Sequence, residues 1–595
     1  MLLLNQRYKV KEMLKIKIKK LIKNTLLGLY KSTKRFPITV CISSILSIML
    51  IVMTEMANSL DENTLEILQR ISMILALGIP FSLCIKFIFE KTNIANYKKI
   101  LGYALSALIL IGYYFFLLKD FDMVSITRYI GVTVFLYLAF MYIPRINNKD
   151  YYEYYVIKVL SSFFLTVIYS VVLYLGLVFI IFSVDKLFLV NMSEKIYMQV
   201  FFIVSLVFGV TMFLAKIPFN KQDFSNSNYP KALKILILYI LIPLINVYTA
   251  ILYAYFIKII VTMNWPVGLV SHLVLWFSVI SVAVIFFIYP IIKEKKLAKN
   301  FVNFFPKAII PILIMMFISI GIRIRAYGFT ENRYYVLVLG IWVLGIILYF
   351  CFSKKNRNII IPISVSILVL NSVFGPLSGY SISKLSQNNR LEDILIRNDM
   401  LVDKKIVSST KISKKDKTEI SNILHYFKNN HNLDDVRYIS DDFQIKNMEE
   451  TFGFPFTNIS DVRKNRYFNY SSYKNAKVIN TKGYDYLIDL NNSENEINLN
   501  DSIKVIYDRS SYDLKVMENE KVIYNKDLFE YADILNKKYE GSSPRKSIDH
   551  KEMTFIDENE RVNVTFVFKS ISGTKEVSEE IKINHMDFYF LIKIK

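Results

Sequence analysis

Three arginines stand close together in a short segment between two long apolar runs. The segment, residues 323–335, holds Arg323, Arg325 and Arg333 together with Glu331. A guanidinium group presents N–H donors in one plane and binds phosphate or carboxylate with two parallel hydrogen bonds. We therefore expect these four residues to bind an anionic lipid head group or another phosphate-bearing ligand. The alternative is a structural network in which Glu331 pairs with an arginine and tyrosines anchor the segment at a membrane interface.

Three polar residues inside the apolar runs form a second candidate site. Asn246 follows Pro243 by three positions, and a proline within a helix frees a backbone carbonyl. Lys258 and His272 lie in the same run and in the next one. Polar groups beside such a break line a cavity or a proton path in some membrane proteins. The alternative is ordinary hydrogen bonding between helices.

Several kinds of catalytic site are not encoded in the chain. There is no phosphate-binding loop of the form GxxxxGK[ST], no HExxH, no GxSxG and no CxxC pair. The three cysteines all lie in apolar runs, and none of the 15 acidic residues before residue 381 lies at the centre of a run. We therefore expect no metal and no cofactor, and a non-enzymatic role is favoured over an enzymatic one.

The positive charge is concentrated in one part of the chain. Lys and Arg number 39 against 15 acidic residues in residues 1–380, and 34 against 35 in residues 381–595. A nucleic-acid-binding protein carries its basic patch on a soluble surface. Because the C-terminal part is nearly neutral, we expect no nucleic-acid partner.

Eleven apolar runs are long enough to cross a bilayer, whose hydrocarbon core of about 30 Å needs about 20 residues of helix. Hydrophobic residues make up 53% of the chain, and its mean hydropathy is +0.34. The runs lie near residues 36–55, 68–89, 100–118, 124–143, 157–182, 196–215, 233–261, 268–292, 305–322, 334–352 and 358–375. This pattern predicts a multi-pass protein whose first partner is the lipid bilayer.

The distribution of basic residues predicts the orientation. With the N-terminus in the cytoplasm, the segments on that side carry 29 Lys and Arg and the opposite segments carry nine. Basic residues in short loops favour the cytoplasm. An odd number of spans then places the C-terminal domain outside. The abundance of Lys, Ile, Asn and Tyr favours an AT-rich bacterial genome, so we expect a bacterial plasma membrane.

Four regions follow from these patterns. Residues 1–35 form a basic cytoplasmic segment, predicted to be an amphipathic helix on the membrane surface or a solvated tail. Residues 36–375 form the transmembrane helical domain, and residues 376–400 form a juxtamembrane helix. Residues 401–595 form an extracytoplasmic mixed α/β domain with a β-rich core, since apolar residues there alternate with a period of two between turn residues. The predicted fold is an α-helical polytopic bundle followed by a soluble α+β, mainly antiparallel β, domain.

Four blocks of sequence carry a resemblance to a known family. They are Arg35-Phe36-Pro37 and residues 238–278, 321–344 and 375–395. In these blocks the chain resembles the uncharacterised bacterial integral membrane family called domain of unknown function 4153. The resemblance covers the membrane region and the start of the outer domain. It implies a membrane location and provides no activity, ligand or catalytic residue.

Two functions remain after these exclusions. The first is a non-enzymatic cell-envelope protein that binds or translocates an anionic lipid or small solute, or scaffolds envelope protein partners through its outer domain. The second is an integral membrane enzyme of the transferase type acting on lipid-linked substrates at the outer face. Asp61 and Glu62, adjacent acids in a short loop, favour the second only weakly.

Overall fold

The chain folds into two compact units in a computed structural model. The structure describes residues 28–57, 59–92, 95–147, 150–188, 192–219, 222–263, 269–353, 357–440, 442–456, 466–472, 479–490, 495–539, 545–575 and 581–595. The first unit comprises residues up to Ile406 together with 423–443, and the second comprises 407–422 and 444–595. Most of the predicted basic segment lies outside the described residues, but 28–35 are helical.

Ten helices of the described chain are long and apolar enough to cross a membrane, which confirms the predicted fold class. Two of them contain a π-helical turn, a rare element that often marks a functional position. In chain order the ten helices are α2 (Pro37–Met56), α3 (Glu62–Lys91), α4 (Asn96–Phe116), α5 (Met123–Tyr142) with η1 (Ile143–Arg145), α6 (Tyr152–Phe188), α7 (Lys195–Phe202) with η2 (Ile203–Gly209) and α8 (Val210–Ala215), α9 (Lys231–Ile235) with η3 (Leu236–Leu241) and α10 (Ile242–Thr262), α11 (Leu269–Ile288) with η4 (Tyr289–Ile291), α12 (Lys296–Tyr327) and α13 (Glu331–Phe352). The π-helical turns are η2 and η3.

The eleventh predicted span forms a shorter helix, α14 (Ile360–Val373), of 14 residues. That length is about 21 Å of helix. Its contacts nevertheless extend along most of α5. Ser366 lies near the C-terminal end of α5, where its Oγ is 3.4 Å from the hydroxyl of Tyr142, and Phe374 lies under the guanidinium of Arg128 near the N-terminal end. The two helices are therefore antiparallel.

The residues that flank α14 define the two ends of the bundle. Asn358, just before α14, donates a hydrogen bond to Glu153 in the first turn of α6. Leu377, just after α14, accepts a hydrogen bond from the hydroxyl of Tyr334 in the first turn of α13. We call these the Glu153 end and the Tyr334 end of the bundle.

Arg35 joins three parts of this unit. Its guanidinium binds Glu90 with two hydrogen bonds of 2.9 Å, and it donates to the carbonyls of Ile217 at 2.8 Å and Pro218 at 3.2 Å. Bidentate binding of this kind fixes the geometry of both partners. The start of α2, the last turn of α3 and the segment after α8 are thus held together.

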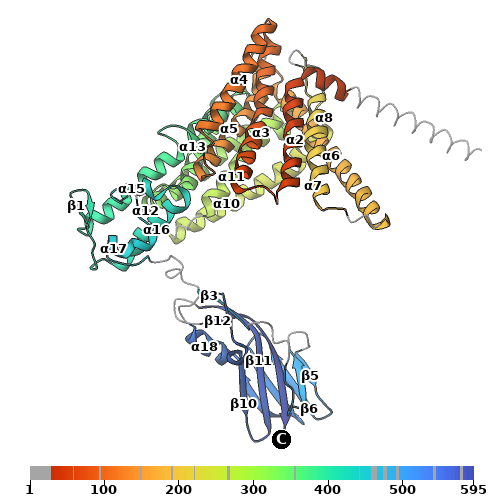
Figure 1. Cartoon of the computed structure of the whole chain (residues 1–595). Coiled ribbons are helices and arrows are strands. Elements are labelled where there is room, and N and C mark those ends of the chain that lie inside the picture. The colour runs from red at the N-terminus through yellow and green to blue at the C-terminus, as the bar shows by residue number, and fades with distance from the viewer. Residues whose placement is uncertain are drawn as a thin grey trace, which may run out of the picture. The chain divides into compact units, whose positions relative to one another are not determined.

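The first unit continues beyond the apolar helices into a polar helix pair. Its elements are α15 (Gly379–Arg397), the hairpin of β1 (Leu401–Val402) and β2 (Lys405–Ile406), the later part of α16 (Lys414–Asn430) and η5 (Leu433–Asp435). The Asn388 amide donates to the carbonyl of Asp435 at 2.9 Å and accepts from the backbone N–H of Arg437 at 2.8 Å. Residues 423–443 are therefore fastened to α15, which lies beside α12 and α13 in Figure 1.

The second unit begins with a short helical segment and continues into a β-rich part. η6 (Ile445–Asn447) and α17 (Met448–Phe452) end at Gly453, whose φ is +84°. The Ser409 N–H donates to the carbonyl of Phe452 at 3.1 Å. A Cβ at Gly453 would lie 2.8 Å from the nitrogen of Ser409, so this turn requires glycine for both its conformation and its space.

The described residues of the β-rich part form two sheets around a common core, with the helical elements α18 and η8. A six-stranded sheet has the order β4-β12-β11-β3-β9, with β10 also paired to β11, and a four-stranded sheet has the order β5-β6-β7-β8. All pairs are antiparallel except β3 with β9. The strands are β3 (Arg466–Ser472), β4 (Tyr486–Asp489), β5 (Glu496–Asn498), β6 (Ile503–Asp508), β7 (Asp513–Glu518), β8 (Lys521–Asp527), β9 (Arg545–Ile548), β10 (Thr554–Glu558), β11 (Val562–Lys575) and β12 (Ile581–Ile594), with α18 (Phe529–Lys538) after β8 and η8 (His550–Met553) before β10.

Alternating side chains of both sheets fill that core. Val564, Phe566 and Phe568 of β11 are fully buried, as expected for a strand with one face against a core. The ring of Tyr507 in β6 lies 5.3 Å from that of Phe588 in β12 and links the two sheets. The predicted mainly antiparallel β domain with peripheral helices is confirmed.

Candidate functional site

The predicted arginine segment forms the tight turn between α12 and α13. Gly328 ends α12 with a φ of +67°, and a Cβ there would lie 2.7 Å from Cδ of Arg390 in α15. Glycine is required because the backbone adopts a positive φ and because α15 approaches so closely. The segment between the two apolar runs is therefore largely helical, and its polar residues lie near the end of α12 and in the first turn of α13.

Two guanidinium groups converge on the carbonyl groups of this turn. Arg333 donates through Nη1 to the carbonyl of Gly328 at 2.7 Å and to that of Tyr327 at 3.1 Å. Arg390 donates through Nη1 to the same Tyr327 carbonyl at 2.9 Å. The last carbonyls of a helix lack partners within the helix and carry its negative dipole end. Hydrogen bonds to these carbonyls stabilise Arg333 and Arg390, which explains how two like charges lie close together at this turn.

The positive charge of the three predicted arginines is not neutralised by a carboxylate. Arg323 and Arg390 lie close enough to Arg333 to repel it electrostatically. The Nε atom of Arg323 is buried without a hydrogen-bond partner, while Arg325 is exposed. Within the described ranges, none of Arg323, Arg325 and Arg333 forms an ion pair with an acidic side chain. We call Arg323, Arg333 and Arg390 the arginine cluster. The predicted site residue Arg325 is two positions from Arg323 and so faces the opposite side of α12.

Glu331 lies in a different environment from the arginines, so its predicted pairing with one of them is wrong. Its Oε1 accepts a hydrogen bond of 2.5 Å from the hydroxyl of Tyr426 and lies 2.9 Å from Nε2 of His431. The reason is helical geometry. Two residues along a helix differ by about 200° in direction, so Glu331 and Arg333 face opposite sides of α13.

Glu331, Tyr426 and His431 form a buried cluster at the Tyr334 end. The side chain of His431 is 1% exposed and that of Glu331 is 11% exposed. Burial, together with the nearby carboxylate of Glu331, raises the pKa of the Tyr426 phenol well above its ordinary value. Tyr426 therefore stays protonated and donates to Glu331. The ring of Tyr380 packs on His431 with centroids 5.4 Å apart, which brings α15 into the same cluster.

His431 was not predicted from the sequence to belong to this site. It lies 100 residues from Glu331 along the chain, directly after the last residue of α16. The one available signal was the pair Tyr426 and His431 on either side of a helix end, and such a pair is common in soluble helices.

Comparison with known proteins adds a family. The model of a family described as "Domain of unknown function (DUF4153)" matches residues 43–409. The chain belongs to this family. An uncharacterized protein of Pasteurella multocida (strain Pm70) is similar at 22% identity over 339 residues, which are 57% of each chain; the chain thus spans just over half of that relative. No solved structure matches.

The DUF4153 match includes the arginines of α12, α13 and α15 but ends before Tyr426 and His431. The arginine cluster therefore lies entirely within the family region. The buried cluster joins Glu331, a residue of that region, to a part of this chain that follows it.

The three intramembrane polar residues predicted in this DUF4153 chain are not brought together. Asn246, Lys258 and His272 are all exposed on the helices. Asn246 and Lys258 are 12 positions apart on α10, which is about 18 Å. The helical break predicted at Pro243 coincides with the π-helical turn η3 directly before it. Asn246 and residues of α12 line a hollow of about 540 Å³. Neither Lys258 nor His272 is among the residues that line it.

Proposed function

We propose that the chain is a non-enzymatic, multi-pass protein of the bacterial plasma membrane that binds an anionic, phosphate-bearing group at the arginine cluster. The observation that carries this proposal is the gathering of Arg323, Arg333 and Arg390 around one turn, with no acidic side chain paired to Arg323 or Arg333. Guanidinium groups without an acidic partner, such as those of Arg323 and Arg333, favour an anion with several oxygen acceptors. Phosphate, free or in a lipid head group, fits that chemistry.

Binding or translocation is favoured over catalysis by the position of Glu331. It is the acidic residue of α13, and its carboxylate accepts a hydrogen bond from Tyr426 and contacts His431. A general acid or base must reach a reacting group, and Glu331 is turned away from the arginines. Scaffolding of envelope partners by the C-terminal domain is a compatible second role.

The orientation forms part of the same proposal. We infer that the N-terminus is cytoplasmic and that the Tyr334 end, with the arginine cluster, faces outward. The 29-to-9 division of basic residues supports this side assignment. The antiparallel contacts of α14 along α5 support an eleventh crossing, which would place the C-terminal domain outside the cytoplasm.

The test uses the full-length protein in detergent with two probes, inorganic pyrophosphate and vesicles of phosphatidylglycerol. We expect Arg323→Gln with Arg333→Gln to weaken binding by tenfold or more (about 1.4 kcal/mol), while the fold remains intact by circular dichroism. Lys119→Gln is the matched control, because Lys119 is an exposed cation on the same predicted side.

The two probes distinguish the sources of phosphate. Binding of both indicates recognition of phosphate itself, and binding of vesicles alone indicates a lipid head group. Equal binding by the wild type and the double arginine variant, or no binding of either probe, would contradict the proposal.

A further inference from the structure

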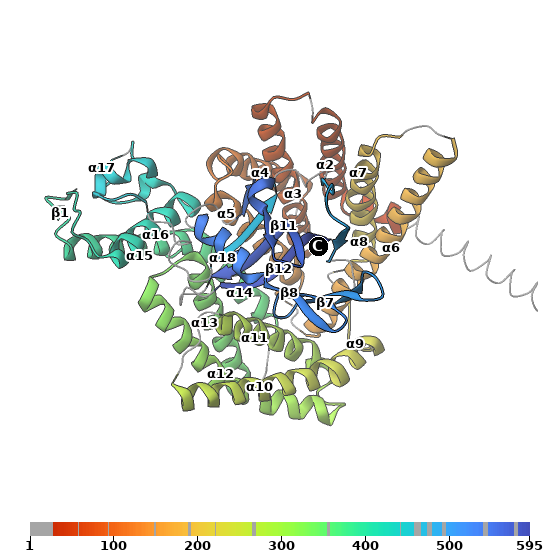
Figure 2. The same ribbon diagram turned by 90° about the horizontal axis from the view of Figure 1, so that it is seen from below.

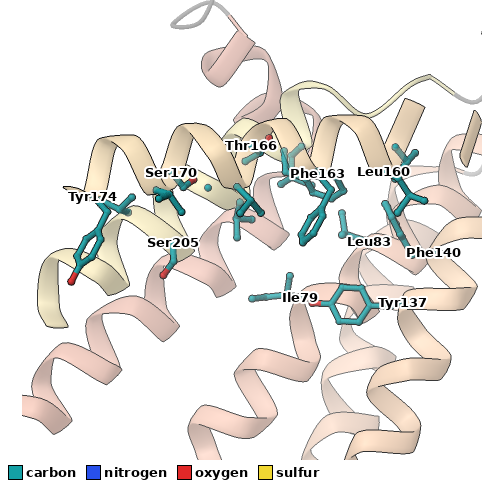
Figure 3. Close-up of a pocket in the computed structure, with 18 of the residues that line it drawn as sticks. Ile79, Leu83, Tyr137, Phe140, Leu160, Phe163, Thr166, Ser170, Tyr174 and Ser205 are labelled. Atoms are coloured by element: carbon teal, nitrogen blue, oxygen red, sulfur yellow. The ribbon is translucent and has the colours of Figure 1, made fainter. Parts of the chain in front are cut away.

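A cavity of about 650 Å³ lies among the apolar helices of the first unit, far from the arginine cluster in sequence. It is lined by α3, α5, α6 and the α7–η2–α8 helix. Figures 1 and 2 both place α6 beside α7 and α8 at the edge of the bundle. Figure 3 shows Thr166, Ser170 and Tyr174 in succession along α6, with Ile79 and Tyr137 on facing helices.

The floor of this cavity is buried and its rim is exposed, although both are apolar. Leu83 and Val204 are 3% exposed, whereas Phe163 is 47% and Val171 is 48% exposed. An exposed apolar rim within membrane-crossing helices faces lipid chains rather than water. The cavity is therefore accessible from the side, where lipid chains lie.

The cavity has the length that one lipid chain needs. Its lining on α6 extends from Val159 to Tyr174, which is about 22 Å of helix. Half of a bilayer core is about 15 Å thick. The lined part of α6 is thus longer than one leaflet is thick, so an acyl chain that enters from one leaflet has room along it.

Two hydroxyl groups on the cavity wall lack partners. Thr166 Oγ1 and Ser170 Oγ are buried without a hydrogen-bond partner, and they lie one turn apart on α6. Ser183 in the same helix and Ser205 in the facing one instead donate to the carbonyl four positions earlier, each at 2.7 Å. Buried hydroxyl groups normally find an acceptor, so these two are available to an ester or hydroxyl oxygen of a bound molecule.

Two lysines lie where the cavity approaches the Glu153 end. Lys158 directly precedes Val159 in the lining, and Lys216 follows Leu214 by two positions. The two ammonium groups are close enough to repel each other. Nζ of Lys216 is buried without a hydrogen-bond partner, 4.6 Å from the centre of the Tyr169 ring.

The neighbouring cation Arg35 differs from Lys216, because Arg35 has an acidic partner. The charge of Arg35 is neutralised by Glu90 at 2.9 Å, and the same guanidinium holds the carbonyl of Ile217, the residue after Lys216. Among the described residues, neither Lys158 nor Lys216 forms an ion pair. The segment carrying Lys216 is thus fixed, while its ammonium group contacts the Tyr169 ring and has no acidic partner.

We propose that this cavity binds one anionic phospholipid, with an acyl chain along α6 and the phosphate between Lys158 and Lys216. The site lies toward the Glu153 end, opposite the arginine cluster, and it stands independently of the function proposed above. A bulk bilayer lipid would satisfy the apolar rim alone. The two lysines lack an acidic partner and the two hydroxyl groups lack a hydrogen-bond partner, and these four groups select a phospholipid with a negative head group.

The test is native mass spectrometry of the full-length protein titrated separately with phosphatidylglycerol and phosphatidylcholine. We expect the wild type to prefer phosphatidylglycerol, and each of Lys158→Gln and Lys216→Gln to reduce that preference about fivefold, the effect of one lysine near an anionic head group. Lys91→Gln, an exposed basic residue at the same predicted membrane face, should leave it unchanged.

A second variant tests the chain-binding part. Val167→Trp at the exposed rim fills the cavity without removing a charge, and it should reduce retention of both lipids while circular dichroism stays unchanged. The arginine variants serve as a comparison, since they should leave the lysine-dependent preference intact. Because the arginine cluster is itself proposed to bind phosphate, the deciding comparison is made in the Arg323→Gln, Arg333→Gln protein. Equal retention of the two lipids by that protein, or a preference in it that survives both lysine substitutions, would overturn the proposal.

Discussion

Oε1 of Glu331 lies 2.9 Å from Nε2 of His431, with both side chains almost completely buried. This pair connects the start of α13 to the segment after α16, and Tyr426 donates a further hydrogen bond to the same carboxylate oxygen. A buried acceptor with two partners is costly to disrupt, because removal of one partner leaves the others unsatisfied in a low dielectric. The cluster therefore holds residues 423–443 against the Tyr334 end of the bundle.

Glu331→Gln should loosen this segment. The amide cannot carry the charge that balances the donors, and we expect a loss of about 3 kcal/mol of local stability. Hydrogen exchange of residues 426–438 in the full-length protein measures it. Glu392→Gln is the control. Glu392 is partly exposed, lies 3.3 Å from Arg437 and accepts a hydrogen bond of 2.8 Å from the hydroxyl of Tyr438, so its replacement should cost less than about 1 kcal/mol. Unchanged exchange in Glu331→Gln would show that the cluster does not hold the segment.

Gly131→Leu should destabilise the bundle where α5 meets α14. A Cβ at Gly131 would lie 2.8 Å from Cγ2 of Val373, and overpacking of this kind costs about 2 kcal/mol. Val373→Ala in the same protein should restore part of the loss, measured as the midpoint of thermal unfolding in detergent. Gly112→Leu is the control, because no atom lies within 4 Å of a Cβ there. Equal midpoints for the two leucine variants would contradict the close contact of α5 with α14.

Reporter fusions should separate the two sides of the membrane. A fusion after Ser353, before α14, should report a cytoplasmic position, and one after Lys595 should report an external position. The physical reason is that α14 reaches both ends of α5. If both fusions report the same side, α14 does not cross the membrane, and the proposed location of the C-terminal domain is wrong.

The β-rich part should lose stability above about pH 10, the ordinary pKa of tyrosine. Burial raises the pKa of Tyr507 and that of Tyr524, and the hydrogen bond of 2.8 Å that Tyr524 donates to Asp557 raises the latter further. A raised folded-state pKa means that the unfolded chain releases these protons first. Stability is therefore complete below the ordinary value and falls as pH rises toward the folded-state value.

Tyrosinate absorbance and the strand signal in circular dichroism, followed together in the full-length protein, test this expectation. The two should change together. In Tyr524→Phe the strand signal should fall less steeply with pH, because one of the linked protons is gone. Full ionisation of the tyrosines with the strand signal intact would contradict it.

Much of the architecture follows from the sequence because it depends on local composition. Long apolar runs must be helical in lipid, and the alternation in residues such as Val564 and Phe566 requires a half-buried strand. The concentration of three arginines in one segment was likewise readable as a candidate anion site. Each of these inferences concerns residues close together in the chain.

Only the tertiary structure decided which distant residues meet. It paired Glu331 with His431 rather than with an arginine, and it brought Lys216 against Tyr169 beside an apolar cavity. The physical reason lies in the membrane helices themselves. A side chain that faces lipid and one that faces another helix are equally apolar, so the pattern along a run does not encode which face packs or which helix becomes its neighbour.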